Sequence, residues 1–166
     1  MPGRYVSAST HRHNAMTMYA DCDYYTAYFG GVLPDKCRWA QRYLRQASAE
    51  IDRFTFGRFG GALPEGEADA VKLQDCTCEI AETLYRIDQA REAAASSATV
   101  NGVKTAGPVA SVSSGSESIS YKTVESAYTE AARSSAKRDA LVYSIIRRYL
   151  TGVAVNGVNV LYCGVM

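Results

Sequence analysis

The chain has 166 residues, of which 47% are hydrophobic and 21% charged, and its formal net charge is +1. This length fits one domain with enough residues for a real core. The near-neutral charge argues against a strongly electrostatic nucleic-acid binder, because neutralising phosphates normally requires a basic excess. No apolar run approaches the roughly 18 residues that a membrane span needs, and the start of the chain lacks the apolar region of a signal peptide.

The first helical signals follow a polar N-terminal extension, residues 1–17. Asp21 or Asp23 is expected to cap a short aromatic helical turn, residues 24–29, which the Gly30-Gly31 pair ends. Pro34 then opens an amphipathic helix that is expected to end near residue 55. One face of this helix carries an apolar stripe. The opposite face carries the arginines Arg38, Arg42 and Arg45.

Two longer helices are expected further along the chain. The first, residues 66–94, has apolar residues on more than one face, which is typical of a helix at the centre of a bundle. The second starts at Val124 or Glu130 and ends at Leu150, before Gly152. The sequence therefore predicts a mainly α protein, a compact bundle of three to five helices in residues 18–150.

An excursion rich in serine, glycine, alanine, valine and threonine separates these two helices, over residues 95–124. Asn101-Gly102 lies between valines, which is a short hairpin signal. Ile119 and Tyr121 alternate with polar neighbours, as in a strand. A disordered linker is the alternative. Because the segment is too long for an ordinary connector, we expect an extended or β-hairpin structure with a role in contacts.

The last segment, residues 151–166, has no charge and no proline. Its larger apolar residues are Val153, Val155, Val158, Val160, Leu161, Tyr162 and Val165. Several of these alternate with small or polar neighbours, as in a strand. Two placements fit this pattern equally well: a hairpin around Asn156-Gly157 that folds back on its own core, or an extended tail that binds a partner's sheet edge or groove.

Signals for chemistry are few. The two histidines, His11 and His13, lie in the polar extension, and an isolated pair of this kind is a weak metal signal. Cys76 and Cys78 would point about 200° apart on a helix, so they are expected to be core residues of a reduced protein. No phosphate-binding glycine loop or catalytic constellation is present. We expect no enzyme activity, cofactor or metal, and a protein whose work is contact with other proteins.

Five separated stretches resemble the small head–tail connector (adaptor) proteins of long-tailed bacteriophages and prophages. Together they span most of residues 18–166, in matching order and spacing. They are residues 18–20, 23–25 and 28–31; 47–52 and 55–58; 70–72, 81–82 and 84–85; 116–121; and 149–152 with 161–165. Three features depart from the family pattern: the extension 1–17, an insertion at 153–159, and Cys163 where members often carry arginine.

The resemblance implies a compact helical fold and a structural role in the virion neck, assembled in the cytoplasm of the bacterial host. It implies a homo-oligomeric ring, commonly of twelve copies, that docks on the portal protein after DNA packaging. The ring extends the channel through which genomic DNA passes without sequence-specific binding, and it receives a stopper or tail-completion protein. In such families the C-terminal segment commonly inserts against the portal, and the excursion commonly contacts neighbours or the next ring.

From these expectations we assign candidate sites. The C-terminal tail with its seven apolar residues is expected to bind the portal, so the partner-binding placement is preferred over the folded-back hairpin. Ring or neck contacts are expected at Arg38, Arg42, Arg45, Ile119 and Tyr121. No membrane contact is expected. The alternative is a small soluble helical-bundle regulatory protein that forms a dimer, which sizing in the presence of portal would distinguish.

Overall fold

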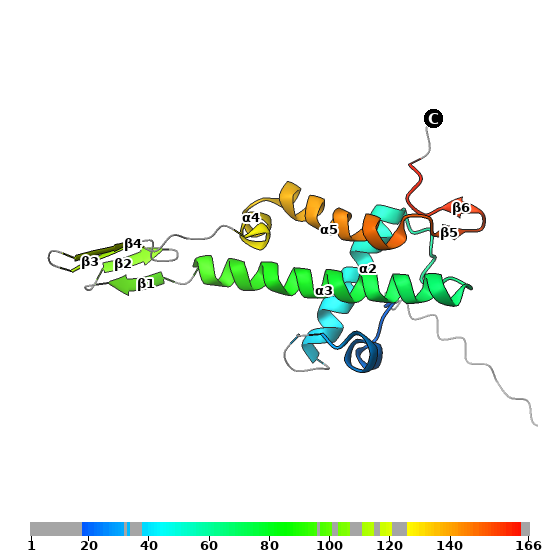
Figure 1. Ribbon diagram of the computed structural model, residues 1–166, viewed down its shortest axis with the longest axis horizontal. Helices are drawn as coiled ribbons and strands as arrows, with labels where there is room; N and C mark the ends of the chain where they lie inside the picture. Colours follow the sequence, from blue (N-terminus) through cyan, green and yellow to red (C-terminus); the bar gives the residue numbers. More distant parts are fainter. Residues whose placement is uncertain are drawn as a thin grey trace, which may run out of the picture.

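The long helix α3, Glu67–Ala95, is the centre of the molecule. The computed structural model describes residues 18–31, 33, 38–95, 97–100, 103–106, 111–114, 117–120 and 126–163. The fold is mainly α, as the sequence predicts. Figure 1 shows α2 crossing α3, while α5 runs along α3, α4 is seen nearly end-on beside it, and small hairpins stand at both of its ends.

The N-terminal turn forms as predicted, with Asp21 as its cap. Helix α1, Cys22–Tyr24, begins where the Tyr24 N–H donates to Asp21 Oδ1 at 2.8 Å. It continues as one π-helical segment, η1, Tyr25–Phe29, and Gly30 ends it in the left-handed region at φ 66°. Gly31 must lack a side chain, because a Cβ there would lie 2.0 Å from the Tyr25 hydroxyl oxygen.

Helix α2, Arg38–Thr55, buries the predicted apolar stripe. Among the buried side chains are Ala40, Tyr43, Leu44, Ala47 and Ile51. Two polar side chains are also buried on this face, and each hydroxyl donates to the carbonyl four residues earlier: Ser48 to Leu44 and Thr55 to Ile51. These bonds satisfy the hydroxyls, which makes their burial tolerable.

Helix α3 is buried on several sides, which confirms its expected central place. Glu67 and Asp69 lie in its first turn, where carboxylates interact favourably with the helix dipole. Buried residues come in consecutive positions, Cys76, Thr77 and Cys78, and then Ile80 and Ala81. Consecutive burial requires neighbours on all sides, and α2, α4, α5 and η1 all pack against this helix.

The prediction of a single helix ending at Leu150 is wrong in one respect, because two helices cover this stretch. Helix α4 covers Ala127–Arg133 and α5 covers Ser135–Leu150. Ser134 lies between them in an extended conformation, and its hydroxyl accepts from the Lys137 N–H at 3.4 Å. Serine readily caps a helix in this way instead of continuing one.

The excursion contains the expected hairpin, and a second one follows it. Strand β1, Ser97–Val100, pairs antiparallel with β2, Val103–Ala106, so that Val100 faces Val103. Strand β3, Ser111–Ser114, pairs antiparallel with β4, Glu117–Ser120. The two sheets are separate, and both lie beyond the C-terminal end of α3, at the left of Figure 1.

A third hairpin closes the chain at the opposite end of α3. Strand β5, Ala154–Val155, pairs with β6, Val158–Asn159. The intervening residues Asn156 and Gly157 both have positive φ, 51° and 76°. This is the type I′ geometry that an Asn-Gly pair favours, and its twist matches that of the flanking strands.

Candidate interaction surfaces

The C-terminal segment folds back on its own body, so the preferred placement of an extended partner-binding tail is wrong for residues 153–160. Val153 and Val160 are fully buried in the main core, and Val155 and Leu161 pack against it. Burying a valine stabilises the fold by about 1.5–3 kcal/mol. The hairpin buries both valines against the core without any partner. Val153 and Val160 are therefore not free for a portal contact in this conformation.

Arg58 fastens the hairpin to the connection between α2 and α3. Its guanidinium Nη1 donates to the Val160 carbonyl at 2.9 Å, and its Cζ lies 5.2 Å from the centre of the Phe56 ring. Inside the hairpin the Val160 N–H donates to the Val153 carbonyl at 3.0 Å. The connection, residues 56–66, and the hairpin thus form one end of the molecule, seen at the right of Figure 1.

Four large apolar side chains are exposed at this end, and we call them the C-terminal surface: Phe56, 64% exposed, Leu63, 43%, Val158, 45%, and Tyr162, 54%. They come from two segments that are about a hundred positions apart in sequence. Of the seven predicted tail residues, Val158 and Tyr162 thus remain available to a partner. Val165 lies outside the described residues.

Phe56 occupies a backbone conformation that phenylalanine rarely adopts. Its φ is 56°, in the left-handed region. The Gly57 N–H donates to the Asp52 carbonyl at 2.8 Å, the Schellman bond that ends a helix, and this places Phe56 at the position where glycine is usual. A left-handed residue with a Cβ costs about 1–2 kcal/mol. A strained position that carries an exposed aromatic ring is one of the patterns that mark functional sites.

A groove of about 380 Å³ lies between the α2–α3 connection and β5. Phe59, Leu63 and Val155 contribute apolar lining, whereas Glu65 and Asp69 contribute carboxylates. Glu65 has no ion-pair partner in the described part of the chain, and Asp69 pairs with Lys72 at 2.7 Å. The groove therefore has apolar walls and a negative rim.

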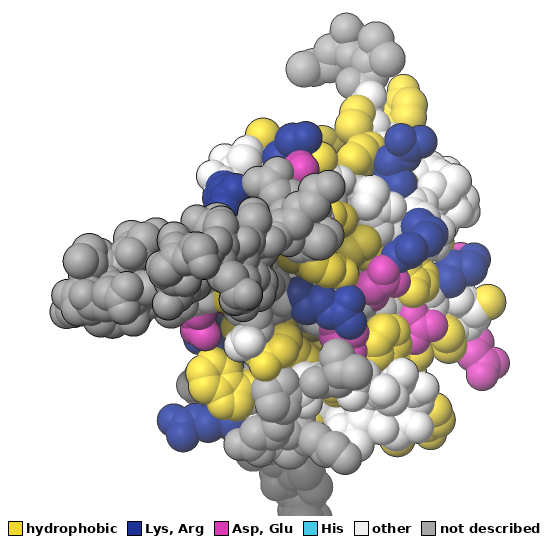
Figure 2. Space-filling model, turned by 60° about the vertical axis from the view of Figure 1, so that its left-hand side comes forward, with side chains coloured by type: hydrophobic (Ala, Val, Ile, Leu, Met, Phe, Trp, Pro, Cys, Tyr) yellow, Lys and Arg dark blue, Asp and Glu magenta, His cyan; other side chains and the backbone are white. Residues whose placement is uncertain are grey.

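The predicted arginine contacts lie on one exposed face of α2, which we call the arginine face: Arg38, Arg42 and Arg45. Exposed Trp39 adjoins them, and the Arg42 guanidinium lies 6.0 Å from its ring and 5.6 Å from the Tyr43 ring. This face is the polar side of an amphipathic helix, which solvation alone accounts for. Figure 2 shows charges of both signs interleaved with hydrophobic side chains over the face in view.

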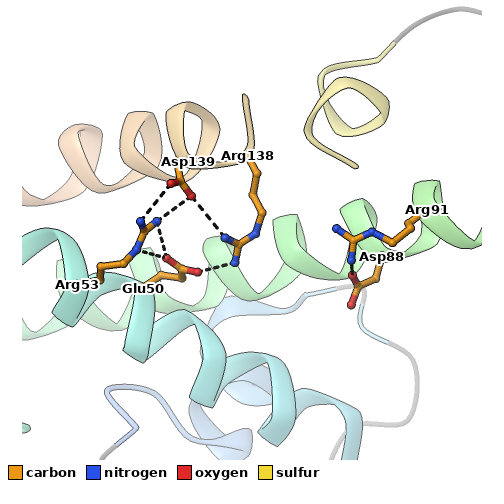
Figure 3. Close-up of polar contacts among 6 residues, drawn as sticks. All are labelled: Glu50, Arg53, Asp88, Arg91, Arg138 and Asp139. Atoms are coloured by element: carbon orange, nitrogen blue, oxygen red, sulfur yellow. Dashed lines mark hydrogen bonds and ion pairs between the residues drawn. The ribbon is translucent and has the colours of Figure 1, made fainter. Parts of the chain in front are cut away.

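Next to the arginine face, an ion network ties α2 to α5. Arg53 donates to Asp139 and Glu50, and Arg138 contacts the same two carboxylates (Figure 3). The hydrogen bonds from Arg53 lower the pKa of Asp139. A separate pair, Asp88 with Arg91, lies along α3. Because these arginines are matched by carboxylates, the network joins elements of the fold and leaves little net positive charge.

Tyrosine hydroxyls fasten the other elements to carboxylates of α3, a feature that the sequence reasoning missed. Each bond comes from a different element. They run from Tyr24 to Asp75, from Tyr25 to Glu82, from Tyr43 to Asp88, and from Tyr149 to Glu79. Burial, reinforced by the neighbouring carboxylate, raises the pKa of Tyr24 and of Tyr43 to about 12. The abundance of tyrosine, 12 residues, was the available signal.

The predicted contacts of the excursion are only partly described. Ile119 lies in β4, where its backbone pairs with that of Val112. Tyr121 lies outside the described residues. Strand β4, which contains Ile119, lies at the end of the molecule opposite the C-terminal surface.

The remaining candidates for chemistry are metal-binding side chains and thiols. Within the described ranges no three histidine, cysteine or acidic side chains are arranged to hold a metal ion. Cys76 and Cys78 are buried, and burial raises the pKa of both thiols, so they stay protonated as core residues. His11 and His13 lie outside the described residues. Among the helices described, none is long and apolar enough to cross a membrane.

Comparison of the chain with protein-family models, curated proteins and solved structures finds no match.

Proposed function

We propose that this protein is a structural adaptor of the bacteriophage neck, without catalysis, and that its C-terminal surface docks on the portal protein. The resemblance of five ordered sequence stretches supports the family. The observation that carries the docking site is the exposed ring of Phe56 on strained left-handed backbone, at the same end of the molecule as exposed Val158 and Tyr162. Within the fold the ring contacts the Arg58 guanidinium, whose Cζ lies 5.2 Å from the ring centre, and its exposed part would give a partner an aromatic anchor.

The composition of the C-terminal surface suits protein contact. Aromatic side chains dominate the energetics of interfaces, because they offer large area at low conformational cost. Phe56 and Tyr162 are the aromatic members, and Leu63 and Val158 lie with them on the same end. The Arg58 guanidinium is held by its hydrogen bond to the Val160 carbonyl, so it places a fixed positive charge at the edge of the apolar surface.

In this proposal the remaining contacts are divided between the other regions. The arginine face, with Arg38, Arg42 and Arg45, contacts neighbouring copies in a ring, which the resemblance puts at twelve. Ile119 and Tyr121 in the excursion contact a neighbour or the stopper or tail-completion protein. Two different faces per subunit are what a head-to-tail ring requires. Genomic DNA passes through the channel, and the balanced surface charge offers it no strong binding site.

Docking is tested by mixing the protein with purified portal rings and measuring particle mass by light scattering. We expect the native protein to add the mass of a ring of copies to the portal. Replacing Tyr162 by serine together with Val158 by serine is expected to weaken this association by at least about tenfold, as for anchor residues worth more than about 1.4 kcal/mol.

A matched control for these variants is Tyr28→Ser, because Tyr28 is also an exposed tyrosine but lies in η1, away from the C-terminal surface. It should bind portal as the native protein does. Unchanged binding by the Tyr162 and Val158 double variant would reject the docking site. A stable dimer that does not bind the portal would instead favour the alternative, a small helical-bundle regulatory protein.

A further inference from the structure

The arginine face carries positive charge that no carboxylate of the same chain matches in the described ranges. None of its three arginines forms an ion pair there. A depression of about 300 Å³ on this face is lined by the three arginines, Gln41 and Gln46, and by no carboxylate. Most other cations of the described part pair with a carboxylate: Arg53, Lys72, Arg86, Arg91, Lys137, Arg138 and Arg148.

Two exposed carboxylates at the start of α3 are also unmatched. Glu65 lies in the α2–α3 connection, and Glu67 is the first residue of α3. Neither side chain forms an ion pair or a hydrogen bond in the described part of the chain. Their Cα atoms are at most about 7 Å apart. Arginines three or four residues apart on a helix have Cβ atoms about 5–6 Å apart, so the two carboxylates can meet two neighbouring arginines of the face at once.

The two sets of charges lie at different places on one subunit. Arg38 is the first residue of α2, whereas the connection that contains Glu65 follows its last residue, Thr55. The 18 residues of α2 span about 27 Å, and Arg45, the arginine nearest the connection, is about 15 Å from that end along the axis. Each copy thus presents both sets, and a second copy can bring them together.

Each of the two surfaces also carries a large exposed apolar side chain. Trp39, 46% exposed, adjoins the arginine face, and Leu63, 43% exposed, lies two residues before Glu65. Exposed ion pairs contribute little each, whereas tryptophan is among the residues that anchor interfaces. A contact that combines the two is stronger than the charges alone, and the charges fix its orientation.

We propose that the arginine face of one copy binds Glu65 and Glu67 of a second copy, with Trp39 and Leu63 adding apolar area. Because the two surfaces differ, the contact is head-to-tail and repeats from copy to copy. This inference names the partner surface for the ring contact in the proposed function, and it rests on that function only for closure into a ring. Its test uses the protein alone, so its failure leaves docking of the C-terminal surface on the portal standing.

Sedimentation velocity of the full chain, over a range of concentrations at low salt, measures this contact. The native protein should form species larger than a dimer, and high salt should weaken them. One variant has Arg38→Glu, Arg42→Glu and Arg45→Glu, and the other has Glu65→Arg and Glu67→Arg. Each variant alone should associate at least about tenfold more weakly, because like charges then face each other. An equal mixture of the two should recover the association, because opposite charges again meet at every contact.

Asp23→Arg and Arg147→Glu are matched controls, because both residues are exposed and lie outside the two surfaces. These controls, alone or mixed, should associate as the native protein does. Circular dichroism should show native helix content in every variant, and glutamine replaces glutamate on the arginine face if the reversal lowers it. A native protein that stays monomeric or stops at a dimer would overturn the proposal. So would charge-reversed variants that associate normally, or a mixture that does not recover.

Discussion

The C-terminal surface and the arginine face are both exposed, but only one of them is explained by the fold. The arginine face is the solvent side of an amphipathic helix whose other side is core, so its three arginines need no partner. The C-terminal surface exposes Phe56 on left-handed backbone, at the same end of the molecule as exposed Val158 and Tyr162. Solvation favours neither the exposure nor the backbone conformation.

This difference shows how to rank candidate interfaces when amino-acid composition and net charge do not single one out. A charged helix face is the ordinary result of folding in water, whereas an apolar group at a costly position requires a separate reason. We therefore assign the main docking role to the C-terminal surface and a weaker, secondary role to the arginine face. The predictions below test that ranking, from the largest expected effect to the smallest.

The largest effect is expected inside the hairpin that supports the C-terminal surface. Val160→Ala should lower the free energy of unfolding by about 1–3 kcal/mol, because it leaves a cavity in the core. Val158→Ala, two residues earlier on the exposed side, should change it by less than about 0.5 kcal/mol. Urea denaturation followed by circular dichroism measures both. Equal effects would mean that the hairpin is not fixed to the core.

A second effect concerns the attachment of α2, which carries the arginine face. The pKa of Tyr43 is raised from its usual 10 to about 12, by burial and by Asp88. The unfolded chain therefore loses this proton first, and the stability from the neutral hydroxyl is fully present below pH 10 and lost as pH rises toward 12. In Tyr43→Phe, the free energy of unfolding should fall less between these pH values. An identical pH profile in the variant would contradict the assignment.

The smallest effect is expected on the arginine face. Replacing Arg38, Arg42 and Arg45 by glutamine should change the free energy of unfolding by less than about 0.5 kcal/mol. Its effect on portal association should be mainly on the association rate and should shrink at high salt, as for charges at an interface rim. Surface plasmon resonance at two salt concentrations measures this. A salt-independent loss larger than that of the Tyr162 and Val158 double variant would reverse the ranking.

Helical periodicity predicted α2, because its burial repeats as the sequence pattern does, and the apolar residues on several faces of the next helix predicted the central place of α3. The Asn-Gly pairs predicted turns, and Asn156-Gly157 forms the expected type I′ turn. The placement of that hairpin was missed because a turn signal predicts the pairing of two strands and does not indicate which surface they pack against. The break at Ser134 was missed because a serine can lie inside a helix or cap the start of one. Here its hydroxyl caps α5 and separates it from α4.

The candidate site was less predictable, for a physical reason. Val158 and Tyr162 were among the predicted tail residues, but nothing local joins them to Phe56 or Leu63. The two segments are linked by the hydrogen bond from Arg58 to the Val160 carbonyl, between residues that are distant in sequence. The strain at Phe56 was also hidden, because a sequence pattern predicts the left-handed conformation for Gly57 alone, whereas both residues adopt it, at φ 56° and 66°. Burial of Ile51 and Thr55 sets the helix register that gives this role to Phe56.

Phe56→Gly tests the central claim most directly, because it removes the ring and the backbone strain together. Portal binding, measured by titration, and the free energy of unfolding, measured in urea, should move in different directions. We predict that portal affinity falls at least about tenfold, while stability stays the same or rises by up to about 1 kcal/mol. Full portal affinity in this stable variant would contradict the account.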